Sequence, residues 1–395
     1  MKLLKVCASG IPLFKDTCEI NFLALQRVTA EDSENMSTMF STETQAFSQN
    51  NALALIGINA SGKTTALKLI TFVCKMLNNE PLNSISCAEV LDGLNNGACT
   101  TITSYFYASS SSTCRLVKDK AINMLQTVIQ KKDDKLIIVH ETLKTKAITR
   151  DTRKKNLLDF DGIEINMSRQ FNEYLLDDVS IMVAFNKRNN EQIFALDMLQ
   201  YTNINQLHLS EDCPLELIAF FDPSVEYLRY EKDNKDIRIT LKFRNKEEIV
   251  LNQFTGLNKY LSSGTIKGIN TFLKAMKTFE IGGYLIIDEL ENHFNHEIVT
   301  TLIRLFMDKD VNPKGAMLIF STHYAELLDE FERNDNIYIV RNREGISVEN
   351  LSTILKRNDI KKSDAYQSGF LDGTVPMYEA YMNLKKALIR KEKEG

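Results

Sequence analysis

Apolar residues along the chain fall into short continuous runs and into helical repeats. Continuous runs are typical of strands that are buried on both faces. They predict strands over Ala52–Ile56, Tyr284–Ile287 and Met317–Phe320. Apolar residues at helical spacing predict helices over Thr65–Leu77 and Lys267–Met276. This alternation of strand and helix predicts an α/β fold with a central sheet.

Other segments alternate between apolar and polar residues, which is the pattern of a strand with one exposed face. Leu3–Leu23 is predicted to form a hairpin, and Ile102–Leu143 and Asp236–Leu251 are predicted to contain further strands. Apolar residues in Phe171–Phe185 and Glu191–Tyr201 have helical spacing instead, which predicts a compact helical lobe. After the strand pair predicted over Ile337–Val340 and Ile346–Leu351, the remaining residues are predicted to be helical.

Composition and charge restrict the class of protein. The 395 residues are 44% hydrophobic and 25% charged, as in ordinary folded proteins. The net charge of −4 favours neither nucleic acid nor an anionic membrane as a partner. Two basic clusters, Lys144–Lys155 and Lys385–Lys393, contain interspersed acids and no aromatic stacking platform, which favours solvated surfaces. Binding of nucleic acid is left open, but the charge does not indicate it.

Segments that would direct the chain to a membrane or an oxidising compartment are not evident. The seven cysteines are scattered, without a CxxC pair or a histidine at zinc spacing, and are typical of reduced thiols. No apolar run reaches the roughly 20 residues that a membrane helix needs. The first residues also lack the apolar segment of a signal peptide. A cytoplasmic protein is expected.

The clearest local motif is Gly57-Ile58-Asn59-Ala60-Ser61-Gly62-Lys63-Thr64, which matches the phosphate-loop pattern G-x-x-x-x-G-K-[ST]. It joins a predicted strand to a predicted helix, so loop N–H groups and the helix N-terminus face a phosphate. Lys63 supplies a mobile positive charge, and the Thr64 hydroxyl is expected to bind Mg²⁺. The predicted ATP-binding residues of this loop are Asn59, Ala60, Ser61, Gly62, Lys63, Thr64 and Thr65.

Two adjacent carboxylates, Asp288 and Glu289, follow the predicted strand Tyr284–Ile287. A phosphate loop needs a carboxylate at the end of a second core strand to hold its metal ion. Neighbouring side chains of a strand point to opposite faces, but at a strand end they can diverge. Asp288 is predicted to hold Mg²⁺, directly or through water, and Glu289 to polarise the water that attacks the γ-phosphate. The alternative is a solvated strand end with two surface acids.

The segment Leu261-Ser262-Ser263-Gly264-Thr265 lies a little over 20 residues before Asp288 and is followed by the helix predicted over Lys267–Met276. It resembles the ABC signature LSGGQ, with Ser263 and Thr265 as variants. The resemblance implies that Ser262, Ser263 and Gly264 grip the γ-phosphate bound to the opposite subunit of a head-to-tail dimer. On its own, the same run is also typical of a helix N-cap.

A histidine, His323, follows the predicted strand that begins at Met317. It resembles the switch histidine of ABC ATPases, which contacts the γ-phosphate and senses hydrolysis, and it joins Lys63 and Glu289 as the implied catalytic residues. The order of phosphate loop, signature, Asp-Glu and histidine identifies the chain as resembling AAA-type ABC ATPases with OLD-like or SMC-like heads.

The segment Leu290-Glu291-Asn292-His293-Phe294-Asn295 stands where ABC proteins carry the D-loop. It resembles the DEPExHLHP run of OLD-like and SMC-like ATPases, with Leu290 in place of proline and Asn295-His296 in place of His-Pro. For His293 and His296, a role in an interface or in the core is favoured over a metal site, because no third ligand is evident. Gln170 and Gln192 are both candidates for a Q-loop glutamine.

The predicted fold is an α/β, ABC/SMC-head-like phosphate-loop ATPase with a mixed central sheet, an antiparallel β subdomain and an inserted helical lobe. No sustained heptads occur between Thr145 and Phe254, so a coiled-coil arm is not expected. The predicted domains are the N-terminal half of the core with the phosphate loop and β subdomain (1–145), a helical/β insertion lobe (146–254), the C-terminal half with signature, Asp-Glu and histidine (255–350), and a helical tail (351–395).

The resemblance implies a slow ATPase with ATP and Mg²⁺ as cofactors, acting as a homodimer or higher homo-oligomer. No nuclease pattern stands out, so the chain most resembles stand-alone ATPase subunits of bacterial anti-phage defence systems of the PARIS, Septu and Abi types. A separately encoded nuclease or toxin is then the implied effector. The alternative is a DNA-engaged, SMC-like repair or maintenance ATPase, and a membrane transporter motor is less favoured than either.

Overall fold

The protein is described by a computed structural model that covers residues 1–109, 120–170, 175–199, 207, 213–233, 236–292, 294–371, 373–374 and 378–394. Its centre is a six-stranded sheet in which five strands are parallel and the last, β17, is antiparallel to its neighbour. The prediction of an α/β fold with a mixed central sheet is confirmed. In spatial order the strands are β10 (Ala195–Asp197), β14 (Tyr284–Ile287), β15 (Met317–Thr322), β5 (Ala52–Ile56), β16 (Ile337–Asn342) and β17 (Ile346–Asn350).

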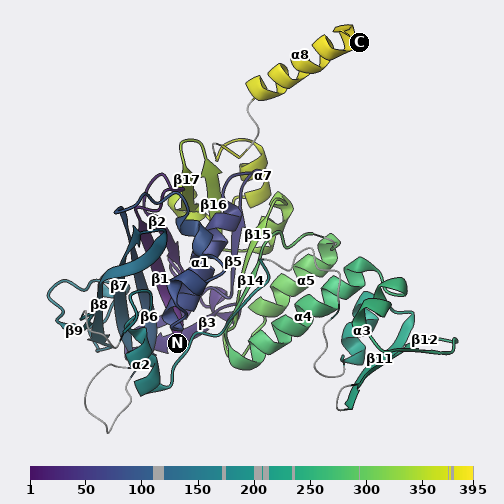
Figure 1. The fold of residues 1–395 in the computed structure, drawn as a ribbon, viewed down its shortest axis with the longest axis horizontal. Coiled ribbons are helices and arrows are strands. Elements are labelled where there is room, and N and C mark those ends of the chain that lie inside the picture. The colour runs from purple at the N-terminus through teal and green to yellow at the C-terminus, as the bar shows by residue number, and fades with distance from the viewer. Residues whose placement is uncertain are drawn as a thin grey trace.

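Both faces of this sheet are covered. Helix α1 (Lys63–Leu77) packs against one face, and α4 (Ser263–Ile281) and α5 (His296–Met307) pack against the other (Figure 1). Alternate residues of β5 enter the two cores, so Leu53 lies with α1 and Ala54 lies with α4 and α5. All five residues of β5 are buried, as expected for a parallel strand between two helical layers.

A second, antiparallel sheet packs on the side of α1 that faces away from the central sheet. Leu3, Phe106 and Leu125 of this sheet share one core with α1. The hairpin predicted near the start and the strands predicted within Ile102–Leu143 are confirmed. The spatial order is β2 (Cys18–Asn21), β1 (Lys2–Ser9), β6 (Cys99–Ser109), β7 (Lys120–Lys132), β8 (Lys135–Ala147) and β9 (Ile165–Ser168), and a separate ribbon pairs β3 (Ser37–Ser41) with β4 (Ala46–Gln49).

The predicted helical lobe needs correction. The helix predicted over Phe171–Phe185 begins only at α2 (Met182–Asn189), and residues 171–174 lie outside the described residues. The helix predicted over Glu191–Tyr201 is wrong, because Ala195–Asp197 form the edge strand β10. A short apolar run is compatible with a helix or a strand. Here the segment is a strand because it pairs in parallel with β14.

Within the described residues, the part of the insertion after residue 213 forms a three-stranded sheet beside α3 (Leu215–Phe221). Its strands are β11 (Val225–Asp233), β12 (Asp236–Phe243) and β13 (Glu248–Leu251), which confirms the strands predicted over Asp236–Leu251. The described part of residues 146–254 therefore holds more strand than helix. The four-part division into domains stays a prediction.

The last part of the chain is helical, as its pattern predicted. The helices are α6 (Leu351–Ile354), α7 (Lys362–Gln367) and α8 (Tyr378–Glu394), and α8 extends away from the body of the molecule (Figure 1). Leu384 and Leu388 of α8 are exposed. In the described part of the chain, no helix combines the length and apolarity needed to cross a bilayer. Of the described cysteines, Cys7, Cys18, Cys74, Cys87 and Cys99 are free thiols, and Cys114 lies outside the described residues.

Candidate functional site

The phosphate loop follows β5 and ends where α1 begins. A Cβ atom added to Gly57 would lie 2.3 Å from the backbone oxygen of Val340. Gly62 has a φ of +98°, and an added Cβ would lie 2.5 Å from Cδ1 of Ile346. Both positions therefore require glycine. At Gly57 the backbone of Val340 comes too close for a side chain. At Gly62 the side chain of Ile346 fills the space, and the backbone is also in the left-handed conformation. The predicted strand–loop–helix context of the motif is confirmed.

Most other predicted loop residues lie at the tip of this turn or just beyond it. Asn59 and Ala60 are exposed, and the Ala60 carbonyl accepts a hydrogen bond of 3.2 Å from Asn342 Nδ2. Ser61 is buried, and its hydroxyl is without a partner among the described residues. Thr65 lies in the first turn of α1. A buried, unpaired hydroxyl within a glycine-bounded turn suits a loop whose ligand comes from outside the chain.

Lys63 is folded back into the loop. Its Nζ donates to the carbonyls of Gly57 at 2.9 Å and Ile58 at 3.2 Å, and lies 3.3 Å from Nδ1 of His323. Burial lowers the pKa of Lys63, although the carboxylates of Asp288, Glu291 and Glu289 act to raise it. A partly buried ammonium group held by carbonyl dipoles can turn toward a phosphate that enters the loop.

Asp288 meets the phosphate loop through Thr64. The Thr64 hydroxyl donates to Oδ2 of Asp288 at 2.7 Å, which joins the start of α1 to the end of β14. A hydroxyl and a carboxylate oxygen are ligands that Mg²⁺ accepts alongside water and phosphate oxygens. The residues predicted to hold the metal ion are therefore brought together, and their chemistry fits magnesium.

Ser321 lies near the end of β15, between β14 and β5, and connects this strand to the acidic residues that follow β14. Its hydroxyl donates to Oδ1 of Asp288 and accepts the backbone N–H of Glu289 at 2.7 Å. Its carbonyl accepts the N–H of Leu290 at 3.0 Å. Sequence reasoning missed Ser321, because a serine at the end of an apolar strand belongs to no motif. Its position two residues before His323 was the only available signal.

Glu289 and His323 lie next to each other at the same edge of the sheet. Glu289 Oε1 is 3.5 Å from Nε2 of His323, and Asn292 Nδ2 donates to the other Glu289 oxygen. Glu289 has a φ of +49°, which ends the extended conformation directly after Asp288. The two carboxylates can therefore diverge within one site, as the sequence predicted. With 45% of its side chain exposed, Glu289 remains accessible to water.

The predicted signature has the geometry of a helix N-cap. Ser262 precedes α4, and its hydroxyl oxygen accepts the N–H of Thr265 at 3.0 Å. Ser262 and Ser263 are exposed and Gly264 is half-buried. Within the described residues, no hydrogen bond or ion pair joins Ser262, Ser263 or Gly264 to the phosphate loop of the same chain. The N-cap alternative is confirmed as geometry, and a role in binding nucleotide stays a prediction.

Three other polar candidates make no link to the site in the described residues. Gln170 and Gln192 have no side-chain hydrogen bond to the phosphate loop or to Asp288. His296 is the first residue of α5 and directly follows the cap residue Asn295. His293 lies outside the described residues. The described part of the chain also contains no group of three or more His, Cys, Asp or Glu residues arranged to hold a metal ion.

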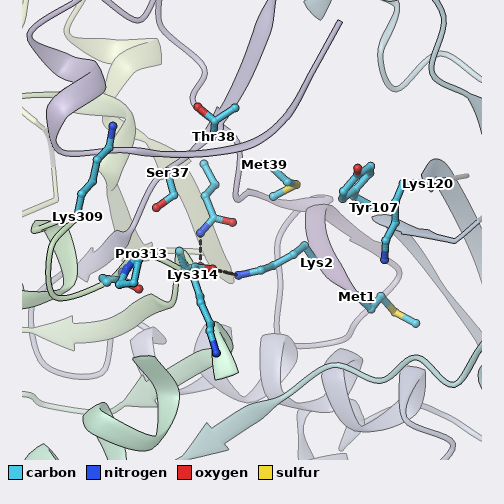
Figure 2. Close-up of a pocket in the computed structure, with 13 residues that line it drawn as sticks. Met1, Lys2, Ser37, Thr38, Met39, Tyr107, Lys120, Lys309, Pro313 and Lys314 are labelled. Carbon is cyan, nitrogen blue, oxygen red and sulfur yellow. Dashed lines mark hydrogen bonds between the residues drawn. The ribbon is translucent and has the colours of Figure 1, made fainter. Parts of the chain in front are cut away.

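A separate pocket of about 510 Å³ lies near the opposite, amino-terminal edge of the central sheet (Figure 2). Four lysines contribute to its wall, but each ammonium group already has a partner within the chain. Lys2 donates to the carbonyls of Gly282 and Gly315, and Lys309 to that of Ser33. The phosphate loop is the stronger candidate for an anion, because it adds the free N–H groups at the N-terminus of α1 to its lysine. The other two lysines and their partners are Lys120 with Glu191 and Lys314 with the carbonyl of Glu280.

Comparison with known proteins gives one result that bears on this site. The sequence model of a family described as "AAA domain, putative AbiEii toxin, Type IV TA system" matches residues 53–329. The matched segment runs from β5 past His323, and it includes the phosphate loop, Ser262–Gly264 and Asp288. Among curated proteins, no significant match was found.

Proposed function

The chain belongs to this family of AAA domains, which are nucleotide-binding phosphate-loop ATPases, and on that premise we propose that it is an ABC-type ATPase. In this proposal two copies close head to tail around two molecules of ATP, each with Mg²⁺, and the nucleotide state of the dimer controls a separately encoded effector in anti-phage defence. The hydrolysis of ATP is slow compared with that of a motor.

The observation that carries the proposal is the convergence of six side chains at one edge of the central sheet. Hydrogen bonds or close contacts join Lys63 to His323, Thr64 to Asp288, Asp288 to Ser321 and Glu289 to His323. They bring together residues that lie more than 200 positions apart in the sequence. Such a grouping of ammonium, hydroxyl, carboxylate and imidazole suits phosphoryl transfer to water.

Each residue has a separate task in the proposed reaction. Loop N–H groups and Lys63 bind the β- and γ-phosphates, and Thr64 and Asp288 hold Mg²⁺, which when bound offsets the phosphate charge. Glu289 orients the attacking water and accepts its proton. His323 contacts the γ-phosphate from the end of β15. Ser321 keeps Asp288 and the backbone of Glu289 in register with that strand.

The dimer is supported by the position of the signature. Ser262 and Ser263 lie exposed at the N-terminus of the 19-residue helix α4, where the helix dipole favours an anion. Among the described residues they make no hydrogen bond or ion pair with the phosphate loop of their own chain, which leaves them available to the loop of a second copy. Control of an effector is supported by the family description, which names a toxin and a type IV TA system.

The test is Glu289→Gln, measured by ATP turnover and by molar mass in solution with and without ATP and Mg²⁺. The isosteric amide keeps the shape of Glu289 but cannot accept the proton, so turnover is expected to fall about 100-fold or more. ATP is expected to hold the variant as a dimer. Glu280→Gln is the matched control, because Glu280 is an exposed carboxylate on α4 paired with Lys277. Wild type that neither binds ATP nor changes mass would contradict the proposal.

A further inference from the structure

Glu291 is a buried carboxylate at the candidate site with no task in the reaction described above. Only 7% of the residue is exposed. Its charge acts on Lys63 together with the charges of Asp288 and Glu289, so it belongs to the same acidic cluster. Burial of a carboxylate is costly unless donors replace the water that it loses. The partners of its two oxygens therefore indicate what the residue does.

One oxygen fixes the backbone at His323. Oε1 accepts the N–H of His323 at 2.6 Å, across the gap between the ends of β14 and β15. The imidazole of His323 lies beside Glu289 and Lys63. Holding the backbone at this position therefore holds the imidazole where it meets both of these residues.

The other oxygen has no partner. Oε2 of Glu291 is buried without a hydrogen bond among the described residues. An acceptor in this position is expected to receive a donor from outside the chain. The phosphates of a nucleotide offer acceptors rather than donors. Magnesium, in contrast, keeps several of its water molecules when it binds to a carboxylate and phosphates, and those waters donate hydrogen bonds.

We propose that Glu291 is a positioning residue with a separate function for each oxygen. Oε1 sets the position of His323, and Oε2 accepts a hydrogen bond from a water of the hydrated Mg²⁺ that arrives with the nucleotide. Asp288 is the direct or water-bridged ligand, and Glu291 supports the outer shell of the same ion. This inference rests on the proposed ATPase function and adds a residue to its metal site.

Glu291→Gln separates the two functions. The amide oxygen can still accept the N–H of His323, while the amide nitrogen replaces Oε2 by a donor. ADP binding is measured by calorimetry at a series of Mg²⁺ concentrations and in EDTA. ADP is chosen because no attacking water takes part. The Mg²⁺ concentration for half-maximal strengthening of ADP binding is expected to rise about tenfold or more, as for other outer-shell partners of metal ions. Affinity in EDTA is expected to stay at the wild-type value.

Two further variants complete the experiment. Glu19→Gln is the matched control, because Glu19 is an exposed carboxylate on β2 paired with Lys5 at 2.8 Å, and it should leave the Mg²⁺ dependence unchanged. Glu291→Ala removes both oxygens and is expected to lower the kcat of ATP hydrolysis below that of Glu291→Gln, with a smaller change in KM. Thermal unfolding of each variant checks that it is folded.

The outcomes are distinct. Wild-type Mg²⁺ dependence in Glu291→Gln overturns the function of Oε2, and equal kcat values for Glu291→Ala and Glu291→Gln overturn the function of Oε1. Failure of the wild-type protein to bind ADP or ATP at any Mg²⁺ concentration would instead contradict the proposed ATPase function itself.

Discussion

At the scale of single residues, Gly62 carries two constraints at once. Its positive φ favours glycine, and the space where a side chain would lie is filled by Ile346 of β17. The shape of the phosphate loop is therefore coupled to the packing of the last strand of the central sheet. Ala60 also has a positive φ, of 60°, but it lies exposed at the tip of the loop.

Gly62→Ala is expected to reduce both stability and ATP binding. Gly97→Ala is the matched control, because Gly97 has a similar φ of +83° but nothing within 4 Å of an added Cβ. The control should lose only the cost of the left-handed conformation, about 1–2 kcal/mol. Gly62→Ala should lose about 1–3 kcal/mol more through overpacking against Ile346. Urea unfolding measures the free energy of unfolding of both variants. Equal losses of stability would show that the side chain of Ile346 can move to make room for the added methyl group.

At the scale of elements, two neighbouring serines at the start of α4 separate the helix cap from the proposed signature. Both serines are exposed, but only Ser262 caps the helix, through the N–H of Thr265. The helix packs through Gly268 directly against Phe221 of α3, so its position also fixes the small sheet of the insertion. A cap and a phosphate-binding signature are compatible, because both use the free N–H groups of the first turn.

Ser262→Ala and Ser263→Ala distinguish the cap from the signature. Ser262→Ala is expected to lower the free energy of unfolding by about 1 kcal/mol, as for other lost caps. Ser263→Ala should leave stability within about 0.5 kcal/mol of wild type, as for other surface substitutions, but weaken ATP-dependent dimerisation. Chemical unfolding and solution mass with ATP measure the two effects. Unchanged dimerisation in Ser263→Ala would argue against a signature at this position.

The elements that carry motifs were predictable from sequence, and their contacts were not. Ala52–Ile56 is apolar throughout and is followed by a glycine-bounded motif, so strand, loop and helix all follow from local pattern. Ala195–Asp197 is too short to show a period, and only its pairing with β14 makes it a strand. Ser321 and Glu291 entered the site through contacts between separate strand ends, which no spacing along the chain reveals.

At the scale of the whole molecule, Lys2 links the two six-stranded sheets. It lies on β1 of the antiparallel sheet and donates to the carbonyls of Gly282 and Gly315, which precede β14 and β15 of the central sheet. Burial lowers its pKa from the ordinary value of 10.5 to about 8. The charge of Lys2 is therefore maintained at neutral pH at a cost to the folded state.

This lowered pKa predicts a pH dependence of stability. Between pH 8 and 10.5 the unfolded chain binds more protons at Lys2 than the folded chain, so this residue makes the free energy of unfolding rise with pH across that window. The stability of wild type relative to Lys2→Met should increase from pH 8 to pH 10.5. Thermal unfolding at both pH values measures the difference, with Lys385→Met on α8 as the control. A difference that stays constant with pH would contradict the lowered pKa.

The order of strands in the central sheet also determines when the nucleotide site can form during synthesis. β5 ends at Ile56, but its two neighbours, β15 and β16, consist of residues beyond 316. A chain that leaves the ribosome N-terminus first therefore exposes the phosphate loop long before the flanking strands have been made. ATP is therefore expected to stabilise the fold only after β15 and β16 have been synthesised.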